Sequence, residues 1–393
     1  MKLSTTVQAL SAAAAVSAAP HSRRQDTHSD LIQVQFPPAE LSAPTITLEE
    51  AIQLMQPAVN DIADGIVDAL DGGRNGDDED INSTTTPTTA SFEEGDETNP
   101  PARTACRDSI RPEWNSMSEP DKLDYISAVQ CLTQAPPRGG IWPGAVTIWD
   151  ELAFVHGTLS GQIHGVDTFL PWHRYFLHAY ETLLADECGY AGPMPWWRET
   201  DAAGDLAGSG LFTPEYFGTL YPVEEGHPGY CISDGPFVGL VDRLHPDGEV
   251  CVARGERTSI SAGVTVEMQE VCHGGENAGT LPQHSACVEL TNHSRLHNAV
   301  GPTMARVGGS TYDAIFYLHH AYVDFQWKSW QNADQRRYSG VEGCVNHVAE
   351  GGACEPLTLD TVLTSLGLVP DLTVRDVLDT ENETMCYTYD DLL

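Results

Sequence analysis

The 393-residue chain is strongly acidic, with 57 Asp and Glu side chains against 20 Lys and Arg and a formal net charge of −37 at pH 7. This charge excludes nucleic acid as a partner, because phosphate groups would be repelled. A membrane-spanning helix is not expected either, since no run approaches the ~20 consecutive apolar residues that such a helix requires. The length suffices for one large domain or two ordinary ones.

The N-terminal quarter has the composition of targeting and linker sequence. Residues 1–19 combine a lysine with an Ala/Val-rich run and end in small residues, which is typical of a secretory signal peptide. We expect 20–102 to be an N-terminal extension, or a propeptide, because Arg23-Arg24 offers a dibasic cleavage site. Residues 47–72 have apolar side chains at helical spacing, whereas 73–102 are acidic and rich in Ser, Thr and Pro, which predicts a disordered linker.

Residues 103–393 have the pattern of a mainly α-helical domain. Ser118 and Asp121 form a capping signal before a stripe made of Leu123, Ile126, Val129 and Leu132. Further helices are predicted within 145–159, 171–188, 290–300 and 311–331, with Asp313 as a cap for the last. The stretch 200–285 is rich in Gly and Pro and is predicted to form long ordered loops with little β structure.

All ten cysteines lie after residue 100, and none belongs to a C-x-x-C pair. That spacing disfavours a thiolate zinc site or a thioredoxin-like motif. In a secreted chain, an even number of scattered cysteines predicts disulfides that tie long loops together, without fixing their pairing.

The histidines fall into two groups at positions of interior character. His156 lies on the apolar face of its helix, where an unpartnered imidazole would be costly to bury. The full set is His156, His164 and His173 in the first group, and His293, His297 and the adjacent pair His319-His320 in the second. Neighbouring helical residues point about 100° apart, so we expect only one of the pair to face a shared centre.

Asn292-His293-Ser294 presents two incompatible chemistries. It matches the N-glycosylation pattern, which would place it on an exposed loop. His293 and His297, however, are four residues apart and so lie on one helix face as a metal chelate. Because the chelate requires a buried His293, we expect no glycan at Asn292 and regard Asn82 and Asn382 as better acceptors.

Six imidazoles directed at one cavity would form a dinuclear metal site of the kind that helix bundles build. Neutral imidazoles suit copper, zinc, iron or nickel. With three nitrogens per metal and no carboxylate, two copper ions sharing a small bridging ligand fit best. Asp324, one turn after His320, fits a supporting role in which it orients a ligand ring through the other ring nitrogen.

Three segments resemble the copper-binding motifs of type-3 copper proteins, which include tyrosinases, catechol oxidases and haemocyanins. They are "IHGVDTFLPWHRYFLHAYE", "HSRLH" and "DAIFYLHHAYVDFQWKSWQ", and in particular they resemble secreted short tyrosinase-like oxidases of filamentous fungi. The resemblance covers about 103–393 and implies a four-helix bundle housing two coppers. It implies that His156, His164 and His173 hold one copper, that His293, His297 and His320 hold the other, and that His319 lies behind the second. It also implies that Arg111 stacks on the Tyr387–Tyr389 motif near the C-terminus.

The sequence departs from the family pattern near the site. Gln162 occupies the position of a cysteine that often forms a thioether bond to the second histidine, so that bond is absent. "PWWRE" (195–199) replaces the usual "PYWDW", which changes the contacts around the ligands. Ser294 replaces an asparagine that helps deprotonate monophenols in many tyrosinases, although Asn298 follows the next histidine. Val307 occupies the position of the gate over the first copper and is small.

The resemblance therefore implies a secreted oxidase that uses O2 to oxidise o-diphenols to o-quinones. We expect o-aminophenols to be substrates as well. Ser294 favours diphenol oxidation over monophenol hydroxylation, which is the alternative activity. A haemocyanin-like oxygen carrier would use the same ligands, but the chain has a single such domain and no repeat. A zinc hydrolase is disfavoured because the H-E-x-x-H motif is absent and because such an enzyme does not need two sets of three histidines. The expected partners are therefore O2 and small phenols.

Overall fold

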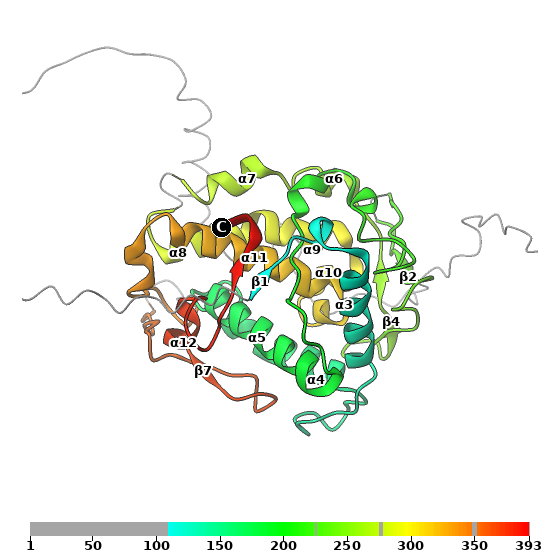
Figure 1. The fold of residues 1–393 in the computed structure, drawn as a ribbon, viewed down its shortest axis with the longest axis horizontal. Helices are drawn as coiled ribbons and strands as arrows, with labels where there is room; N and C mark the ends of the chain where they lie inside the picture. The colour runs from blue at the N-terminus through cyan, green and yellow to red at the C-terminus, as the bar shows by residue number, and fades with distance from the viewer. Residues whose placement is uncertain (1–108, 225, 275–277, 348–351, 393) are drawn as a thin grey trace, which may run out of the picture. The chain divides into compact units, whose positions relative to one another are not determined.

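The computed structural model describes residues 109–392 except 225, 275–277 and 348–351. The predicted signal peptide, N-terminal extension, acidic linker and Asn82 lie outside the described residues. The described part is mainly helical, as predicted (Figure 1). Its helices are α3 (Glu119–Leu132), α4 (Ile148–Ile163), α5 (Phe169–Cys188), α6 (Thr258–Ser261), α7 (Val266–Val271), α8 (Leu281–Val288), α9 (Ser294–Val300), α10 (Pro302–Ala305), α11 (Ile315–Asn332) and α12 (Val374–Leu378).

Helix α5 is the centre of the bundle and packs against α3, α4 and α11, while α11 also contacts α8. The predicted capping signal of α3 is confirmed, because the Ser118 side chain accepts a hydrogen bond from the Asp121 backbone N–H. Val129 and Leu132 are fully buried, and each stabilises the packing by about 1.5–3 kcal/mol. Leu123, at the start of the predicted stripe, is 41% exposed, so it does not belong to the buried face of α3.

Local sequence signals set the ends of α4 and α5. Thr147 and Asp150 form a reciprocal capping box at the start of α4. Gly189, in the left-handed region with φ 67°, ends α5. At α11, Asp313 lies one residue before the N-cap position, and its carboxylate accepts the Ile315 N–H at 3.1 Å while forming an ion pair with Arg254 at 2.6 Å.

In the described residues, the β strands form four pairs of two-residue strands, with isolated β-bridges beside them. The antiparallel pairs are β2 (Tyr230–Cys231) with β5 (Ala253–Arg254), β3 (Val241–Asp242) with β4 (Val250–Cys251), and β6 (Val362–Leu363) with β7 (Leu372–Thr373). The parallel pair joins β1 (Ile110–Arg111) to β8 (Thr388–Tyr389), which brings the two ends of the described domain together. The prediction of little β structure is therefore confirmed.

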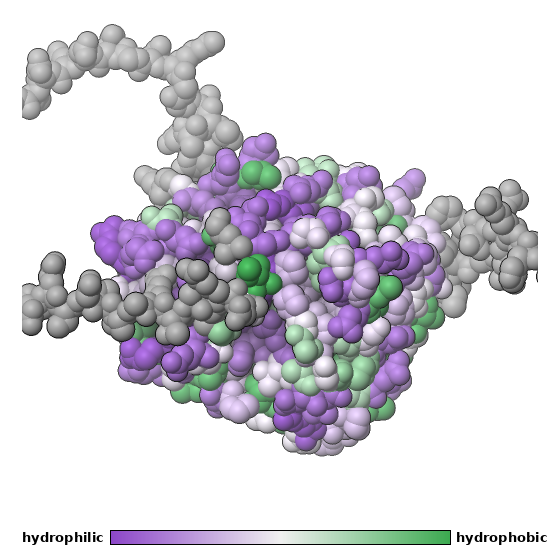
Figure 2. Space-filling model, viewed as in Figure 1, coloured by the Kyte–Doolittle hydropathy of each residue, from purple (hydrophilic) through white to green (hydrophobic). Residues whose placement is uncertain are grey.

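Disulfides tie the long connections, as predicted. The described pairs are Cys131–Cys188, Cys231–Cys251, Cys272–Cys287 and Cys344–Cys354, and Cys386 is also disulfide-bonded. The face seen in Figure 2 is largely hydrophilic, with apolar residues scattered across it. In the part of the chain that the structure describes, every helix is too short or too polar to cross a membrane.

Candidate dinuclear metal centre

The first histidine group is brought together by α4 and α5. His156 lies in the middle of α4, His164 is the residue that ends this helix, and His173 lies in the second turn of α5. The ring centroids of His156 and His164 are 5.1 Å apart, and those of His164 and His173 are 5.0 Å apart. One ring nitrogen from each histidine lies within 4.8 Å of those of the other two. The three predicted residues therefore converge on one point.

The second group contains the four histidines that the sequence analysis places in it. His293 ends a π-helical turn, His297 lies in α9, and His319 and His320 lie in α11. One ring nitrogen of each of the four lies within 4.8 Å of the others. Both members of the adjacent pair therefore lie close to the other histidines of the group. Because neighbouring helical side chains point about 100° apart, the assignment of His320 as the ring that faces the metal, with His319 behind it, stays a prediction.

The two groups adjoin each other. The rings of His173 and His320 stack with centroids 4.4 Å apart and an interplanar angle of 12°. Phe169 lies between the groups, with its ring centroid 4.7 Å from that of His173 and 4.8 Å from that of His293. This proximity is what a dinuclear site requires.

Most of the imidazoles are fixed through Nδ1. The acceptors for four of them are backbone carbonyls: Ser160 for His164 at 3.1 Å, Phe169 for His173 at 2.8 Å, Glu289 for His293 at 3.1 Å, and Met304 for His297 at 2.7 Å. A carbonyl oxygen can only accept, so Nδ1 carries the proton and Nε2 keeps its lone pair. This is the tautomer that a metal-ligating histidine adopts.

The environment keeps these rings neutral. Burial lowers the pKa of His164 to about 4 and the pKa values of His297 and His319 to about 3. Burial, reinforced by the neighbouring histidines, also lowers the pKa values of the remaining four, His156, His173, His293 and His320. Among the described residues, Nε2 of His156, His173, His293 and His319 is buried without a hydrogen-bond partner. Neutral rings with unpartnered lone pairs fit metal ions at this site.

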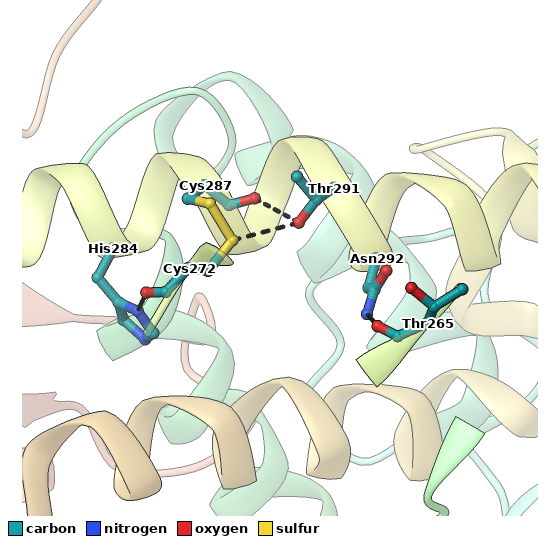
Figure 3. Close-up of a disulfide and its surroundings, with 6 residues drawn as sticks. All are labelled: Thr265, Cys272, His284, Cys287, Thr291 and Asn292. Carbon is teal, nitrogen blue, oxygen red and sulfur yellow. Dashed lines mark hydrogen bonds between the residues drawn. A yellow bond between two sulfur atoms is a disulfide. The ribbon is translucent and has the colours of Figure 1, made fainter. Parts of the chain in front are cut away.

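A break in helical geometry precedes His293. Glu289–His293 form a π-helical turn, and Thr291 within it has non-helical dihedral angles (φ −98°, ψ −109°). The Thr291 hydroxyl donates to the Cys287 carbonyl at 2.6 Å and lies 3.4 Å from the Cys272 sulfur, so the disulfide abuts the turn (Figure 3). π-Turns often occur at functional sites because they re-aim the following side chain, and here that side chain is His293.

Asn292 is part of the same turn and points into the protein. It is fully buried, and its amide donates to the Thr265 carbonyl at 2.9 Å (Figure 3). A glycan could not be accommodated at this amide without unfolding the turn, which agrees with the prediction from the chelate spacing. Asn382 is partly buried and its amide donates to the Asp376 carbonyl at 2.8 Å, so its glycosylation stays a prediction.

We expect Asn292 to be unmodified in protein secreted by a glycosylating host. Peptide mapping by mass spectrometry, with and without enzymatic deglycosylation, measures this directly. The Asn292 peptide should have its unmodified mass in both samples. A deglycosylation-dependent mass change at Asn292 in folded protein would contradict the buried position.

Two of the other predicted pocket residues, Ser294 and Asn298, lie on the helix that carries His297, and Val307 lies on the loop after α10. Ser294 begins α9, and its carbonyl accepts a hydrogen bond from the Asn298 side chain at 2.8 Å. The Val307 side chain is 49% exposed. Its loop approaches α4 closely, since a Cβ on Gly157 would lie only 3.0 Å from the Gly308 carbonyl oxygen. Val307 therefore lies on a loop next to the helix that carries His156, and its role as a gate over the first copper stays a prediction.

Asp324 does not have the role that the sequence predicts. Its carboxylate accepts hydrogen bonds from Arg174 at 2.5 Å, Tyr387 at 2.6 Å and Tyr389 at 2.5 Å, and it pairs with Arg111 at 3.3 Å. All of its polar contacts among the described residues are with these groups and not with a histidine ring. Position 324 lies on the side of α11 that faces the paired chain ends, so Asp324 joins these ends to the bundle.

The predicted contact of Arg111 with the C-terminal tyrosines is confirmed. The guanidinium carbon lies 3.5 Å from the ring centroid of Tyr387 and 5.7 Å from that of Tyr389. Arg111 also forms an ion pair with Glu181 at 2.6 Å. This group of contacts connects β1, α5, α11 and β8.

Two acidic residues beside the histidines were not predicted as part of the site. Glu199 is fully buried, accepts a hydrogen bond from His319 Nδ1 at 2.7 Å, and has its pKa raised by burial. Burial also raises the pKa of Glu289 to about 8, and this carboxylate accepts the Gly165 N–H at 2.8 Å. Two features of the sequence could have indicated these residues. Glu199 lies in the unusual "PWWRE" segment, and Glu289 lies four residues before His293.

Comparisons with known proteins agree with the geometry. Residues 146–333 match the family model described as the common central domain of tyrosinase. Tyrosinase ustQ from Aspergillus flavus is 33% identical over 297 residues, which cover 72% of this chain and 79% of that protein. N-acetyl-6-hydroxytryptophan oxidase ivoB from Emericella nidulans is 27% identical over 343 residues, which cover 72% of this chain and 92% of that protein.

A solved structure shares the fold. A mutant polyphenol oxidase from Thermothelomyces thermophila superposes with a TM-score of 0.64 at 21% identity, covering 87% of this chain and 97% of that one. The matched family domain includes both histidine groups, and the matched relative is covered over most of its length. The chain therefore belongs to the tyrosinase family of type-3 copper proteins.

Proposed function

We propose that this protein is a dinuclear copper polyphenol oxidase that uses O2 to oxidise o-diphenols and o-aminophenols, yielding o-quinones from the diphenols. The observation that carries the proposal is the pair of adjoining groups of buried histidines, one ring nitrogen of each lying within 4.8 Å of the others in its group. The tyrosinase-family fold implies dinuclear copper, and all-imidazole ligation suits that metal. The general class of the protein is therefore that of a tyrosinase-family oxidoreductase.

In this proposal each histidine group holds one copper ion. The ligands of the first are His156, His164 and His173, and those of the second include His293, His297 and His320. When bound, the copper pair supplies the redox chemistry by which two electrons pass from the phenol to O2. The carbonyl acceptors at Nδ1 fix the ring orientations before metal binds, which supports a preorganised site.

The surrounding residues would control access and substrate choice. Phe169, packed between the two groups, helps to exclude water from the ligand nitrogens. Val307 is small and half exposed, which leaves room for phenols larger than catechol. This openness supports including bicyclic phenols among the candidate substrates, as the name of the N-acetyl-6-hydroxytryptophan oxidase relative also suggests.

Monophenol hydroxylation is the alternative activity, and Ser294 is the residue that bears on it. Replacing Ser294 by asparagine is expected to raise the ratio of monophenol to diphenol turnover by roughly fivefold, because the amide adds one water-holding hydrogen bond worth about 1 kcal/mol. Ser294→Ala, which adds no amide, is the matched control. Initial rates on tyramine and on catechol measure the ratio. An equal ratio in all three proteins would remove Ser294 from the account of specificity.

The test of the proposed activity is oxygen uptake by copper-loaded protein on catechol, tyrosine, tyramine, 2-aminophenol and 6-hydroxyindole. Catechol and 2-aminophenol should be consumed catalytically, with many molecules of O2 used per chain. Fast uptake on tyrosine without a lag or added diphenol would instead favour the monophenol hydroxylase. An oxygen carrier would bind O2 reversibly without consuming any of the substrates.

We also propose that the protein is secreted after removal of residues 1–19. The disulfides of the described domain support this, because such bonds persist in oxidising compartments. N-terminal sequencing of protein from the culture medium of an expressing fungus would test it. That measurement also reports whether residues 20–102 are retained.

A further inference from the structure

A further pair of histidines lies outside the two groups of the dinuclear centre. His284 is a fully buried residue of α8, and His273 is a half-buried residue two positions after the end of α7. Their ring centroids lie 5.4 Å apart, with 34° between the ring planes. Neither histidine belongs to the groups of three and four described above. The proposed oxidase function therefore makes no use of this pair.

Both rings have a buried nitrogen that lacks a partner. The Nδ1 of His284 donates to the Cys272 carbonyl at 2.8 Å, so its Nε2 keeps the lone pair (Figure 3). Among the described residues, the Nε2 atoms of His284 and His273 are both buried without a hydrogen-bond partner. Burying a polar atom without a partner costs free energy, and such atoms are rare in native proteins. Two of them on neighbouring rings indicate a ligand that both nitrogens share.

The surroundings keep both rings neutral, which is the state that binds a metal ion. Burial lowers the pKa of His284 to about 3. Burial also lowers the pKa of His273, against the opposing effect of a hydrogen bond to the Gln326 backbone. The positive charge of Arg337 adds to the lowering at both histidines. Neutral imidazoles can take up a metal ion without first releasing a proton.

The number of donors and the nearby charge select the kind of ion. Zinc in proteins is almost always held by four ligands, whereas within the described ranges no third His, Cys, Asp or Glu side chain forms a group with these two. Monovalent copper is satisfied by two imidazole nitrogens. Arg337 and His284 both lie against the ring of Trp330, so a positive charge is close to the pair. Because repulsion scales with the charge of the ion, this environment favours a monovalent over a divalent cation.

We propose that His273 and His284 form an accessory site for a soft monovalent cation, Cu⁺ in the native protein, which their two Nε2 atoms hold. The partial exposure of His273 gives the ion an entry path to the buried His284. The site shares no histidine with the dinuclear centre and involves no redox step, so it does not depend on the oxidase proposal. With only two nitrogen donors, it should lose its ion on dialysis.

The first experiment uses Ag⁺ as the probe, because this ion is soft and monovalent like Cu⁺ and keeps its oxidation state in air. Copper-loaded protein is mixed with one equivalent of Ag⁺ in chloride-free buffer and ultrafiltered at equilibrium. Mass spectrometry then counts the silver and copper that stay with each chain. The unmodified protein should bind one Ag⁺ beside its two coppers. His273→Asn and His284→Asn should each bind two coppers and no Ag⁺.

The matched control is His178→Asn. It makes the same substitution at a half-buried histidine of α5 that belongs neither to this pair nor to the dinuclear centre. The control protein should bind one Ag⁺, as the unmodified protein does. A second measurement uses copper itself: titration with Cu⁺ under anaerobic ascorbate should reach three ions per chain in the unmodified and control proteins. It should reach two in His273→Asn and in His284→Asn.

The outcomes separate this site from the dinuclear centre. Equal silver binding in the unmodified protein and in both variants would overturn the accessory site, and so would an unmodified protein that binds two coppers and no Ag⁺. Either result leaves the oxidase proposal standing, because catechol oxidation does not involve the pair. If His284→Asn does not fold, the half-buried position decides, and retention of Ag⁺ by His273→Asn would overturn the site.

Discussion

Replacing His173 by alanine is expected to reduce the copper content from two ions per chain to one and to abolish most of the oxidase activity. His173 is one of three imidazoles in the first group, and its Nδ1 is fixed by the Phe169 carbonyl at 2.8 Å. Loss of an outer-shell partner typically costs 10- to 100-fold in metal affinity or activity, so loss of the ligand itself should cost at least about 100-fold. Metal analysis and oxygen uptake on catechol measure the two effects.

The matched control is His178→Ala. This histidine lies on the same helix, five residues further along, and belongs to neither group. The control protein should keep two coppers and nearly full activity. If His173→Ala retained two coppers and turned over catechol like the unmodified protein, the first group would not be a metal site. Parallel thermal melts of the metal-free proteins would distinguish ligand loss from general unfolding.

Replacing Asp324 by asparagine is expected to destabilise the domain by about 3–5 kcal/mol, because it breaks buried ion pairs and leaves charges uncompensated. The Arg111 and Arg174 side chains are 1% and 0% exposed, and both pair with this one carboxylate. An amide can accept from one guanidinium but presents N–H groups to the other. Urea unfolding followed by circular dichroism measures the loss of stability.

The control for this change is Asp360→Asn, which removes an ion pair with Arg375 on the surface. The side chains of Asp360 and Arg375 are 83% and 59% exposed, and exposed ion pairs contribute only about 0–1 kcal/mol to the free energy of unfolding. The two variants should therefore differ by several kcal/mol although each removes one carboxylate from an arginine. Equal unfolding midpoints would show that the Asp324 contacts add nothing to stability.

The same carboxylate makes stability depend on pH with a defined sign. Burial alone would raise the pKa of Asp324, but Arg174 and Arg111, with hydrogen bonds from the tyrosines, outweigh it and hold the pKa below its ordinary value of 3.8. The unfolded state therefore binds a proton first as pH falls. The contribution is complete above pH 3.8 and is lost as the pH drops through the still lower pKa of the folded protein. Asp324→Asn should flatten this part of the acid unfolding curve.

The sequence was sufficient to predict the helices and the two histidine groups because both depend on local spacing. Ser118 and Asp121 signalled the start of α3, and the four-residue interval between His293 and His297 placed two rings on one face. Three of the Nδ1 acceptors also lie four residues before their histidine, as Phe169 does before His173. Such contacts follow from helical geometry alone.

The parts that sequence could not predict depend on contacts between distant segments. Glu199 reaches His319 across 120 positions, and Asp324 meets Tyr389 across 65. The spacing along α11 correctly places Asp324 one turn after His320, but it does not reveal that Asp324 lies on the side of α11 that faces the paired chain ends. The predicted contact of Asp324 with a histidine ring was therefore wrong. The π-helical turn at Thr291 likewise contacts the Cys272–Cys287 disulfide, and the pairing of cysteines has no local signal.

The measurement that tests the dinuclear copper proposal most directly is the metal content of folded protein purified after copper loading, determined by mass spectrometry against protein concentration. Two copper ions should be retained per chain after dialysis, and one after the His173→Ala change. X-ray absorption at the copper edge should show nitrogen ligation typical of imidazole. A ratio of one or fewer in the unmodified protein, or displacement of copper by equimolar zinc, would contradict the account.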